Sequence, residues 1–317
     1  MIKILHKDFS TKIIFYSFIV LLLVPVFIES TYIRHLFIMA FIYGVIASNW
    51  NLSLGYTGIL NFGHLAFFGI GVYTAGIFSK QLGVSPFLTI PLGGLFACVG
   101  AIIISVPILR LKGIYVILVS FAFSQICLQF VLALEPITGG SGGLPLLPSI
   151  KIGDYNLARD GKFSYYYISL ILLTISTVFL YIIVNSKLGL RLIALRDNEE
   201  LATSRGISVS YYRLICLVLS AFFTGVIGGF FAHYARVASY DIFGFGPISL
   251  ALSMLLIGGT GSVYGPIIGS IFLMFLSESL QDLGAFRFLI IGSVIIIVML
   301  FFPGGLNGLI DRFKKNR

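Results

Sequence analysis

Charged residues are scarce in this chain. Only 10% of its 317 residues are Asp, Glu, Lys or Arg, while 58% are hydrophobic, and soluble domains carry about 25% charged residues. A surface this poor in charge is predicted to face lipid. Because a helix crosses the hydrocarbon core with roughly 20 apolar residues, the chain is long enough for about ten spans joined by short loops. We therefore predict an all-α integral membrane protein with about ten transmembrane helices, in which residues 1–317 form a single transmembrane domain.

Cysteine is equally scarce, and the spacing of its three copies is not typical of a metal site or a disulfide pair. Each lies in an apolar stretch, where cysteine acts as a packing residue; they are Cys98, Cys127 and Cys216. Groups for catalysis are missing too, since no nucleophile with a base and no acid–base pair lies near the predicted spans. His64 is the one ionisable residue deep within a predicted span, and a lone histidine beside glycines is more typical of packing. The sequence predicts no metal, no cofactor bound by this chain and no enzymatic activity.

Apolar runs between polar breaks mark the candidate spans. The first run follows lysines as a secretory signal does, but it reaches Glu29 without a small-residue cleavage site, so we interpret it as a retained span. The predicted spans lie near residues 13–28, 36–54, 62–79, 86–109, 113–134, 164–184, 212–234, 246–258, 264–280 and 287–302. An even number of spans places both termini on one side of the membrane.

The distribution of charge orients these spans. If both termini are cytoplasmic, the inner segments hold fourteen of the 21 basic residues and five of the 12 acidic ones, which accounts for the whole net charge of +9. Such an excess follows the positive-inside rule, and it predicts a cytoplasmic loop at 185–212 and an outer loop at 135–163. Nucleic-acid binding is not indicated, because no basic patch with interleaved aromatic residues occurs.

Two spans look broken or short. The segment 247–257 is too short to cross alone and runs into GGTGS at 258–262, and the second span runs into GYTGILNFGH at 55–64. Helices interrupted at matching positions in two halves of a chain are typical of a transport route, although close packing through small residues is an equally good interpretation. With one gap, Gly55, Thr57, Gly58 and Gly63 align with Gly258, Thr260, Gly261 and Gly265. Uncharged polar residues here are candidates for the translocation route: Asn49, Asn51, Thr57, Asn61, His64 and Thr260.

The loop at 185–212 contains signals for a short helix. Asp197 is the predicted N-cap, Glu200 completes a capping box three residues later, and Gly206 is placed to end the helix. The stretch before it is amphipathic, with apolar residues between basic ones, and such residues suit docking into another protein. These apolar residues are Leu188, Leu190, Ile193 and Leu195.

Long motifs along nearly the whole chain resemble the M-type permease of the branched-chain amino acid uptake family, in the family's order. They are NLSLGYTGILNFGHLAFFGIGVYTAG (51–76), LKGIYVILVSFAFSQI (111–126), ITGGSGGLPLLP (137–148), SKLGLRLIALRDNEELATSRGIS (186–208), SLALSMLLIGGTGSVYGPIIGS (249–270) and PGGLNGL (303–309). The resemblance implies a permease like those of type II ABC importers, in the bacterial inner membrane. It also implies four further subunits: a second, related permease, two cytoplasmic ATP-binding subunits and an extracytoplasmic substrate-binding protein.

The resemblance further implies that the loop at 185–212 engages an ATPase. ATP and Mg²⁺ would belong to that partner, since this chain has no GxxxxGK[ST] phosphate loop. Leu188, Leu195 and Ala202 are expected to fill a groove in the ATPase. The full set of expected coupling residues is Leu188, Gly189, Arg191, Leu195, Arg196, Asp197, Asn198, Glu199, Ala202 and Gly206.

The solute implied by the resemblance is leucine, isoleucine or valine. Related permeases import urea or short amides, and an ion-coupled secondary carrier and a non-transporting scaffold are the alternatives from other classes. The sequence departs from the family pattern at two positions. Gln125 replaces a carboxylate and Asn61 replaces a serine that family members commonly carry.

Overall fold

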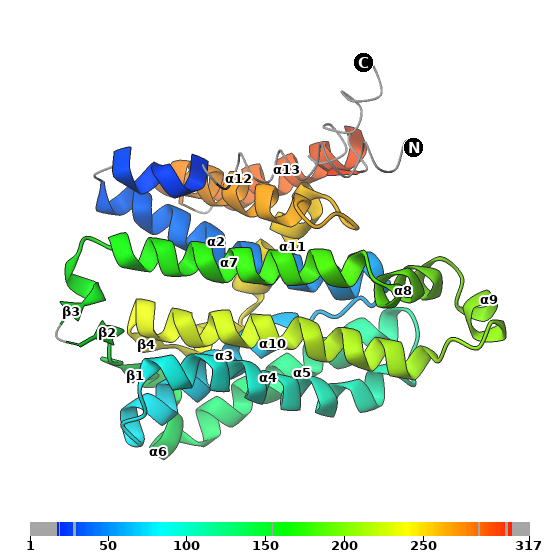
Figure 1. Cartoon of the computed structure of the whole chain (residues 1–317), viewed down its shortest axis with the longest axis horizontal. Helices are drawn as coiled ribbons and strands as arrows, with labels where there is room; N and C mark the ends of the chain where they lie inside the picture. Colours follow the sequence, from blue (N-terminus) through cyan, green and yellow to red (C-terminus); the bar gives the residue numbers. More distant parts are fainter. Residues whose placement is uncertain are drawn as a thin grey trace.

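The computed structural model describes residues 18, 20–27, 30–153, 155–284, 286–301 and 304–305, and these fold almost entirely into helices. The long helices are α2 (Thr31–Asn51), α3 (His64–Gln81), α4 (Pro86–Ile108), α5 (Ile114–Ala133), α7 (Phe163–Val184) and α10 (Val209–Ala235). The shorter ones are α6 (Glu135–Thr138), α8 (Lys187–Asp197), α9 (Glu199–Ser204), α11 (Phe245–Gly258), α12 (Gly265–Ser279) and α13 (Phe286–Phe301). The long helices lie side by side in one bundle (Figure 1).

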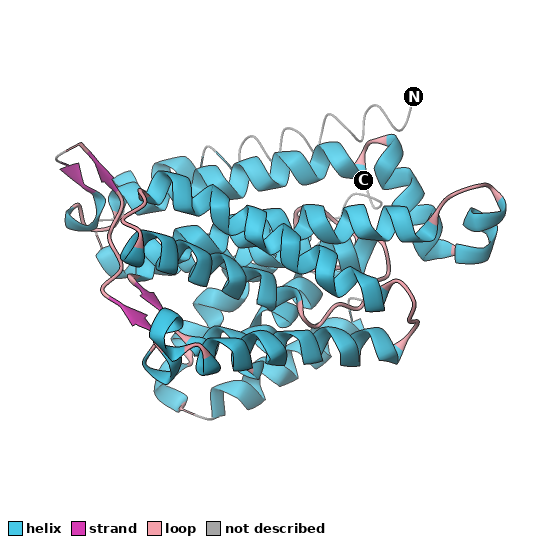
Figure 2. Cartoon of the chain, turned by 90° about the horizontal axis from the view of Figure 1, so that it is seen from below, coloured by secondary structure: helices cyan, strands magenta, loops and turns pink. Residues whose placement is uncertain are grey.

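Two short antiparallel strand pairs complete the described part of the chain. β1 (Leu144–Pro145) pairs with β4 (Val237–Ala238), and β2 (Lys151–Ile152) pairs with β3 (Tyr155–Asn156). The strands gather at one end of the bundle, whereas α8 and α9 project from the opposite end (Figures 1 and 2). The segments predicted as outer and cytoplasmic loops therefore lie at opposite ends.

Helices occupy nine of the ten predicted spans, and in the remaining one, 13–28, the described residues 18 and 20–27 are helical too. Five helical segments are long and apolar enough to cross a membrane: Thr31–Tyr56, Pro86–Ile108, Ile114–Ala133, Phe163–Val184 and Val209–Ala235. Phe245–Gly258, Gly265–Ser279 and Leu289–Phe301 are apolar but shorter. Several long helices also carry exposed Leu, Ile, Val and Phe side chains along their outer faces. Helices that are apolar all round suit a lipid environment.

Contacts between distant loops agree with the predicted alternation of ends. The turn between α4 and α5 meets α9 through an ion pair of Lys112 with Glu199, at 3.2 Å. At the other end the outer loop is joined to the connection after α10 by the pairing of Leu144 with Ala238.

Small residues let three helices of the bundle approach closely. Gly71 of α3, Gly93 of α4 and Gly225 of α10 meet so tightly that a Cβ on Gly225 would lie 2.5 Å from the Gly93 carbonyl oxygen. In membrane proteins such contacts replace the hydrophobic driving force that lipid does not supply. Small residues therefore hold these three helices close together.

Candidate functional site

The two broken segments of the chain meet each other directly. α2 continues into a π-helical turn (Leu52–Tyr56), and an irregular stretch then runs to the start of α3 at His64. Asn51 spans the gap to the other break, because its Nδ2 donates to the Ser262 carbonyl at 2.7 Å and its Oδ1 accepts from the Gly261 N–H at 2.9 Å. We call this contact between residues 51–58 and 258–262 the junction.

Glycine is required on both sides of the junction. A Cβ on Gly55 would lie 2.5 Å from the Gly261 nitrogen, closer than such atoms approach. Gly58 and Gly261, which align in the sequence, have positive φ angles of 71° and 77°. Because this conformation strains any residue with a Cβ, the two glycines are conformational requirements. The predicted broken helices are thus present and interlocked.

The candidate route residues lie mostly inside the protein in this conformation. Asn49, Asn51, Thr57, Asn61 and His64 are at most 1% exposed, while Thr260 is exposed. Asn51 uses both amide atoms to hold the junction, and Thr57 donates to the Ser53 carbonyl. Asn49 donates to Ser176 at 2.8 Å. These contacts are packing roles, so the translocation route stays a prediction at these positions.

Three of these residues keep unused hydrogen-bonding atoms, and in Asn49 it is the buried Oδ1 that has no partner among the described residues. His64 is stacked on Trp50 and shares a 3.0 Å hydrogen bond between its Nε2 and Thr224, but its Nδ1 has no partner among the described residues. Asn61 accepts from the Gly63 N–H at 3.0 Å, and its buried Nδ2 is likewise unpaired there. A buried polar group without a partner costs about 1–3 kcal/mol. Asn49, Asn61 and His64 are therefore the strongest of the route candidates.

One face of α5 carries a shallow apolar groove with two amides. Its cavity of about 590 Å³ is lined by Ala122, Gln125, Ile126, Gln129, Phe130 and Ala133. Gln129 is exposed, and Gln125 is half-buried with its Nε2 donating to the Phe243 carbonyl at 3.5 Å. Only 22% of the α5 segment is buried, the lowest share of the five long apolar segments. Gln125, which replaces a carboxylate common in the resembled family, thus lies on the least buried of these helices.

α8 is attached to the junction by one arginine. Ser186 caps its start by accepting from the Leu188 N–H at 3.1 Å. Near its end Arg196 donates through Nη1 to the Gly55 carbonyl at 2.6 Å, and through Nε and Nη2 to Asp197 at 3.0 and 2.8 Å. A residue expected at the ATPase contact therefore binds a broken helix of its own chain. Arg191, by contrast, is exposed and stacks on Tyr212 at 5.3 Å.

The predicted start of the second helix is wrong by one residue. Asn198, not Asp197, is the N-cap of α9, and its Oδ1 accepts from the Leu201 N–H at 2.9 Å. Asp197 is the last residue of α8, and Glu200 takes no part in a capping box. Asn and Asp are about equally good caps. Asn198 is the cap because α8 ends, and α9 begins, one residue later than predicted. Local sequence does not encode the position of that break.

The predicted C-terminal glycine is confirmed. Gly206 has a φ of 81°, its N–H donates to the Thr203 carbonyl at 2.9 Å, and the Ile207 N–H donates to the Ala202 carbonyl at 3.1 Å. This pair of hydrogen bonds is the Schellman motif, which satisfies the last carbonyls of a helix.

Gly206→Val should weaken the end of α9, because a β-branched side chain is strained at positive φ by about 1–2 kcal/mol. No heavy atom lies within 4 Å of a Cβ built there, so the effect is conformational and not steric. We expect Gly206→Val to lower the import rate several-fold and Gly206→Asn, which tolerates this conformation, to retain most of it. Equal import by the two variants in vesicles would contradict the role of the turn.

Two of the three residues expected to project into a partner point inward. Leu195 is 2% exposed and Ala202 is 4% exposed, and Leu188 packs partly against the same chain. The expectation that Leu195 and Ala202 fill a groove in another protein is therefore wrong in this structure, because both are covered by their own chain. The apolar residues that do face outward are Leu190 and Leu201, at 66% and 56% exposed. Gly189 is buried where a Cβ would overlap the Val184 carbonyl.

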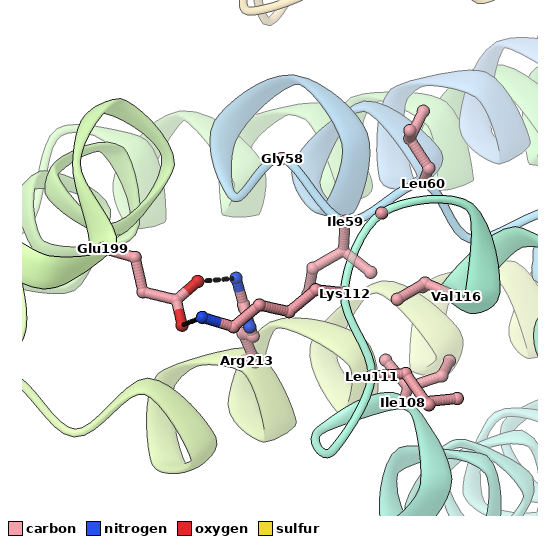
Figure 3. A pocket seen from close by; sticks show the side chains of 10 residues that line it. Gly58, Ile59, Leu60, Ile108, Leu111, Lys112, Val116, Glu199 and Arg213 are labelled. Atoms are coloured by element: carbon pink, nitrogen blue, oxygen red, sulfur yellow. Dashed lines mark hydrogen bonds and ion pairs between the residues drawn. The ribbon is translucent and has the colours of Figure 1, made fainter.

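Glu199 lies at the centre of a charged cluster that the sequence reading missed. Its Oε1 pairs with Lys112 at 3.2 Å and its Oε2 pairs with Arg213 at 2.8 Å. Figure 3 shows the carboxylate between the two cations, beside a cavity of about 150 Å³. The cavity is lined by Gly58, Ile59, Leu60, Ile108, Leu111, Lys112, Gly113, Val116, Glu199 and Arg213. No sequence signal joined these three charges, since Lys112 lies in the turn between α4 and α5, Glu199 in α9 and Arg213 in α10.

Partial burial acts to raise the pKa of Glu199, but the charges of Arg213 and Lys112 outweigh it, so its pKa lies below the usual value. Glu199 is therefore ionised at neutral pH, and the cluster keeps both ion pairs. Because the pKa is depressed by native partners, this contribution to stability is present above the pKa of the unfolded chain. It is lost as the pH falls through the lower, folded value.

The outer loop is held in place by several contacts. Lys80 donates to the Pro145 carbonyl at 3.0 Å, and Arg236 donates to the Leu147 carbonyl at 3.1 Å. Together with the β1–β4 pairing these contacts attach residues 144–147 to α3 and α10. Leu146, between them, has a φ of 59° and is 79% exposed. The segment therefore presents an apolar side chain from an ordered base.

No group of three or more His, Cys, Asp or Glu side chains within the described residues could hold a metal ion. The three cysteines are free, and buried Cys216 donates to the Leu52 carbonyl at 3.4 Å. The candidate site is therefore a set of hydrogen-bonded and charged links between helix ends.

Comparison with known proteins gives one consistent result. The chain matches the family described as branched-chain amino acid transport system / permease component over residues 32–302. It is 26% identical over 289 residues to the high-affinity branched-chain amino acid transport system permease protein LivM of Salmonella typhimurium and of Escherichia coli, covering 84% of this chain and 68% of each relative. It is also 26% identical over 342 residues to the probable branched-chain amino acid transport permease protein LivH of Methanocaldococcus jannaschii, covering 100% of this chain and 98% of that protein. No solved structure matches the chain.

The family match covers most of the chain, and the apolar helices agree with it. The chain therefore belongs to the permease component family of branched-chain amino acid transport systems, and it is an integral membrane permease and not an enzyme.

Proposed function

We propose that this chain is one of two permease subunits of an ATP-driven importer that carries leucine, isoleucine and valine across the bacterial inner membrane. The observation that carries the proposal is the link from α8 to the junction, where Arg196 donates to the Gly55 carbonyl at 2.6 Å. A projecting helical segment attached to broken helices can transmit force into the bundle. The family match and the branched-chain relatives support the solute class.

ATP binding and hydrolysis with Mg²⁺ belong to two cytoplasmic partner subunits in this proposal, and this chain binds no cofactor. Closure of the ATPase pair pushes on α8 and α9, where exposed Leu190 and Leu201 supply the apolar contact. Arg196 passes the displacement to Gly55 and so to the junction. The two half-pores then open alternately to the two sides.

The second permease is proposed to cover the α5 groove. Gln125 and Gln129 would be costly to expose to lipid, where a polar group finds no hydrogen-bonding partner. A neighbouring subunit of the same chemistry removes this cost and buries the apolar rim formed by Ile126 and Phe130. We assign about ten spans in the arrangement of type II importers, with both termini cytoplasmic; the terminal residues themselves lie outside the described part.

An extracytoplasmic substrate-binding protein is proposed to dock at the strand end of the bundle. Leu146 offers an exposed apolar contact there, and the pairing of β1 with β4 holds its segment. Release of solute above the bundle would then feed a route near His64 and Asn61, whose unpaired polar atoms suit passage of a zwitterion without tight binding.

Purification of the tagged chain from its native membranes tests the proposal. We expect two ATPase subunits and a second permease to purify with it. In vesicles that contain the complex, the binding protein and labelled leucine are supplied on the side of the strand end, and ATP on the side of α8 and α9. We expect leucine to cross the membrane only when ATP is supplied. Unlabelled isoleucine and valine should compete, and urea should not. Transport by the isolated chain without ATP would identify an ion-coupled carrier. Competition by urea, and not by isoleucine or valine, would identify urea or a short amide as the solute.

A further inference from the structure

The two cations around Glu199 come from different parts of the bundle. Lys112 lies in the turn that joins α4 to α5, and Arg213 lies in the first turns of α10. Glu199 begins α9, where a carboxylate also favours the helix N-terminus. Each carboxylate oxygen takes one cation, Lys112 on Oε1 and Arg213 on Oε2. One side chain therefore connects α9 to both neighbouring elements.

The side chains of Lys112, Glu199 and Arg213 differ in how far they are exposed to solvent. The side chain of Arg213 is 15% exposed and that of Glu199 is 27% exposed, whereas Lys112 is 78% exposed. The Arg213 pair is thus a sheltered anchor within the segment 199–213, and the Lys112 pair reaches across to a separate turn. Leu111 of that turn packs against the buried cluster that includes Ile108 and Val116, whereas nothing lies within 4 Å of a Cβ built on Gly113.

The turn leads directly into α5, which starts at Ile114 and is the least buried of the long apolar segments. A helix with few internal contacts moves more easily than one enclosed on all sides. The same helix carries the groove with Gln125 and Gln129. A pull on the turn at Lys112 would therefore reach that groove.

We propose that Glu199 is a clamp residue that binds α9 to the α4–α5 turn through Lys112, so that displacement of α9 by an ATPase moves α5. The inference rests on the proposed function and assigns Glu199 an internal positioning role, in place of the contact with the ATPase that the resemblance implied. The clamp stays closed through the cycle, and the link through Arg196 and Gly55 drives the junction separately.

Glu199→Gln tests the clamp, with Glu200→Gln as the matched control. Glu200 is the next residue, is exposed, and forms no ion pair within the described residues. In vesicles holding the whole complex we expect Glu199→Gln to assemble and to hydrolyse ATP, but to import at least fivefold fewer solute molecules per ATP. Glu200→Gln should import as the wild type does. Loss of ATPase binding by Glu199→Gln would overturn the clamp in favour of a direct docking role.

Lys112→Met provides the second arm, with Arg110→Met as its control in the same connection. The clamp requires Lys112→Met to lower import per ATP and to add nothing in a Glu199→Gln background, because both changes break one link. If the losses of the two single variants add in the double variant, or if either single variant imports normally per ATP, the clamp is wrong. The protein would still be part of an ATP-driven importer. Import without ATP and without ATPase partners would instead refute the proposed function.

Discussion

Gly55→Val should nearly abolish import. A Cβ at this position would lie 2.5 Å from the Gly261 nitrogen and would overlap the Asn51 amide. The added side chain must therefore separate the two broken segments and break the hydrogen bond from the Gly261 N–H to Asn51, which is 2.9 Å long. Overpacking of this kind costs about 1–3 kcal/mol and a lost buried hydrogen bond adds about 1 kcal/mol.

Uptake of labelled leucine and thermal unfolding of the purified complex measure this effect. We expect uptake to fall by more than tenfold and the unfolding midpoint to drop by several degrees. Gly246→Val is the matched control, since nothing lies within 4 Å of a Cβ at Gly246 in α11. If Gly55→Val and Gly246→Val transport alike, the junction is not the moving part of the route.

Arg196→Ala should separate ATP hydrolysis from import. The change removes the Nη1 donor from the Gly55 carbonyl and leaves Asp197 without its two hydrogen bonds. A hydrogen bond to a charged group contributes about 1.5–3 kcal/mol, so the link from α8 to the junction loses most of its strength. We expect assembly and ATP hydrolysis to persist while import per ATP falls about tenfold.

Arg205→Ala is the control for loss of a positive charge from the same segment. Arg205 is exposed and its side chain forms no hydrogen bond or ion pair within the described residues. Arg196→Lys should recover little, because an ammonium cannot hold the carbonyl and the carboxylate in the planar geometry of a guanidinium. Import per ATP by Arg196→Ala equal to that of Arg205→Ala would remove the transmitting role from Arg196.

The two proposed links differ in what they move. Arg196 connects α8 to the broken helix at Gly55, whereas Glu199 connects α9 to the turn before α5. If both operate, the double variant Arg196→Ala with Glu199→Gln should lose more import than either change alone. Such independence is expected for sites that share no partner.

Much of the fold could be predicted because its signals are local. Apolar runs identified nine helices that the described residues contain, and the basic loops identified which ends lie together. Gly206 was recognised as a helix end because positive φ is a property of one residue and its neighbours. The break at 55–64 was visible in the same way, as glycines and polar residues at the end of an apolar run.

Which side chains point into the protein and which point outward could not be predicted from local sequence. Leu195 and Ala202 have the composition of docking residues, yet tertiary packing places them inside. Asp197 and Asn198 are equivalent caps in sequence, and only the geometry between α8 and α9 selected Asn198. The cluster of Lys112, Glu199 and Arg213 was hidden for the same reason, since contact between charges requires knowing which loops share an end and how closely they approach.

The sequence by itself determined that the chain is a membrane protein with broken helices and a basic segment that contains capped helices, because hydropathy, charge bias and turn chemistry are read over a few residues at a time. The tertiary structure alone decided how these parts connect. Asn51 and Gly261 are 210 residues apart, and Arg196 and Gly55 are 141 apart. Contacts of that range arise from the packing of whole helices, so no local pattern records them.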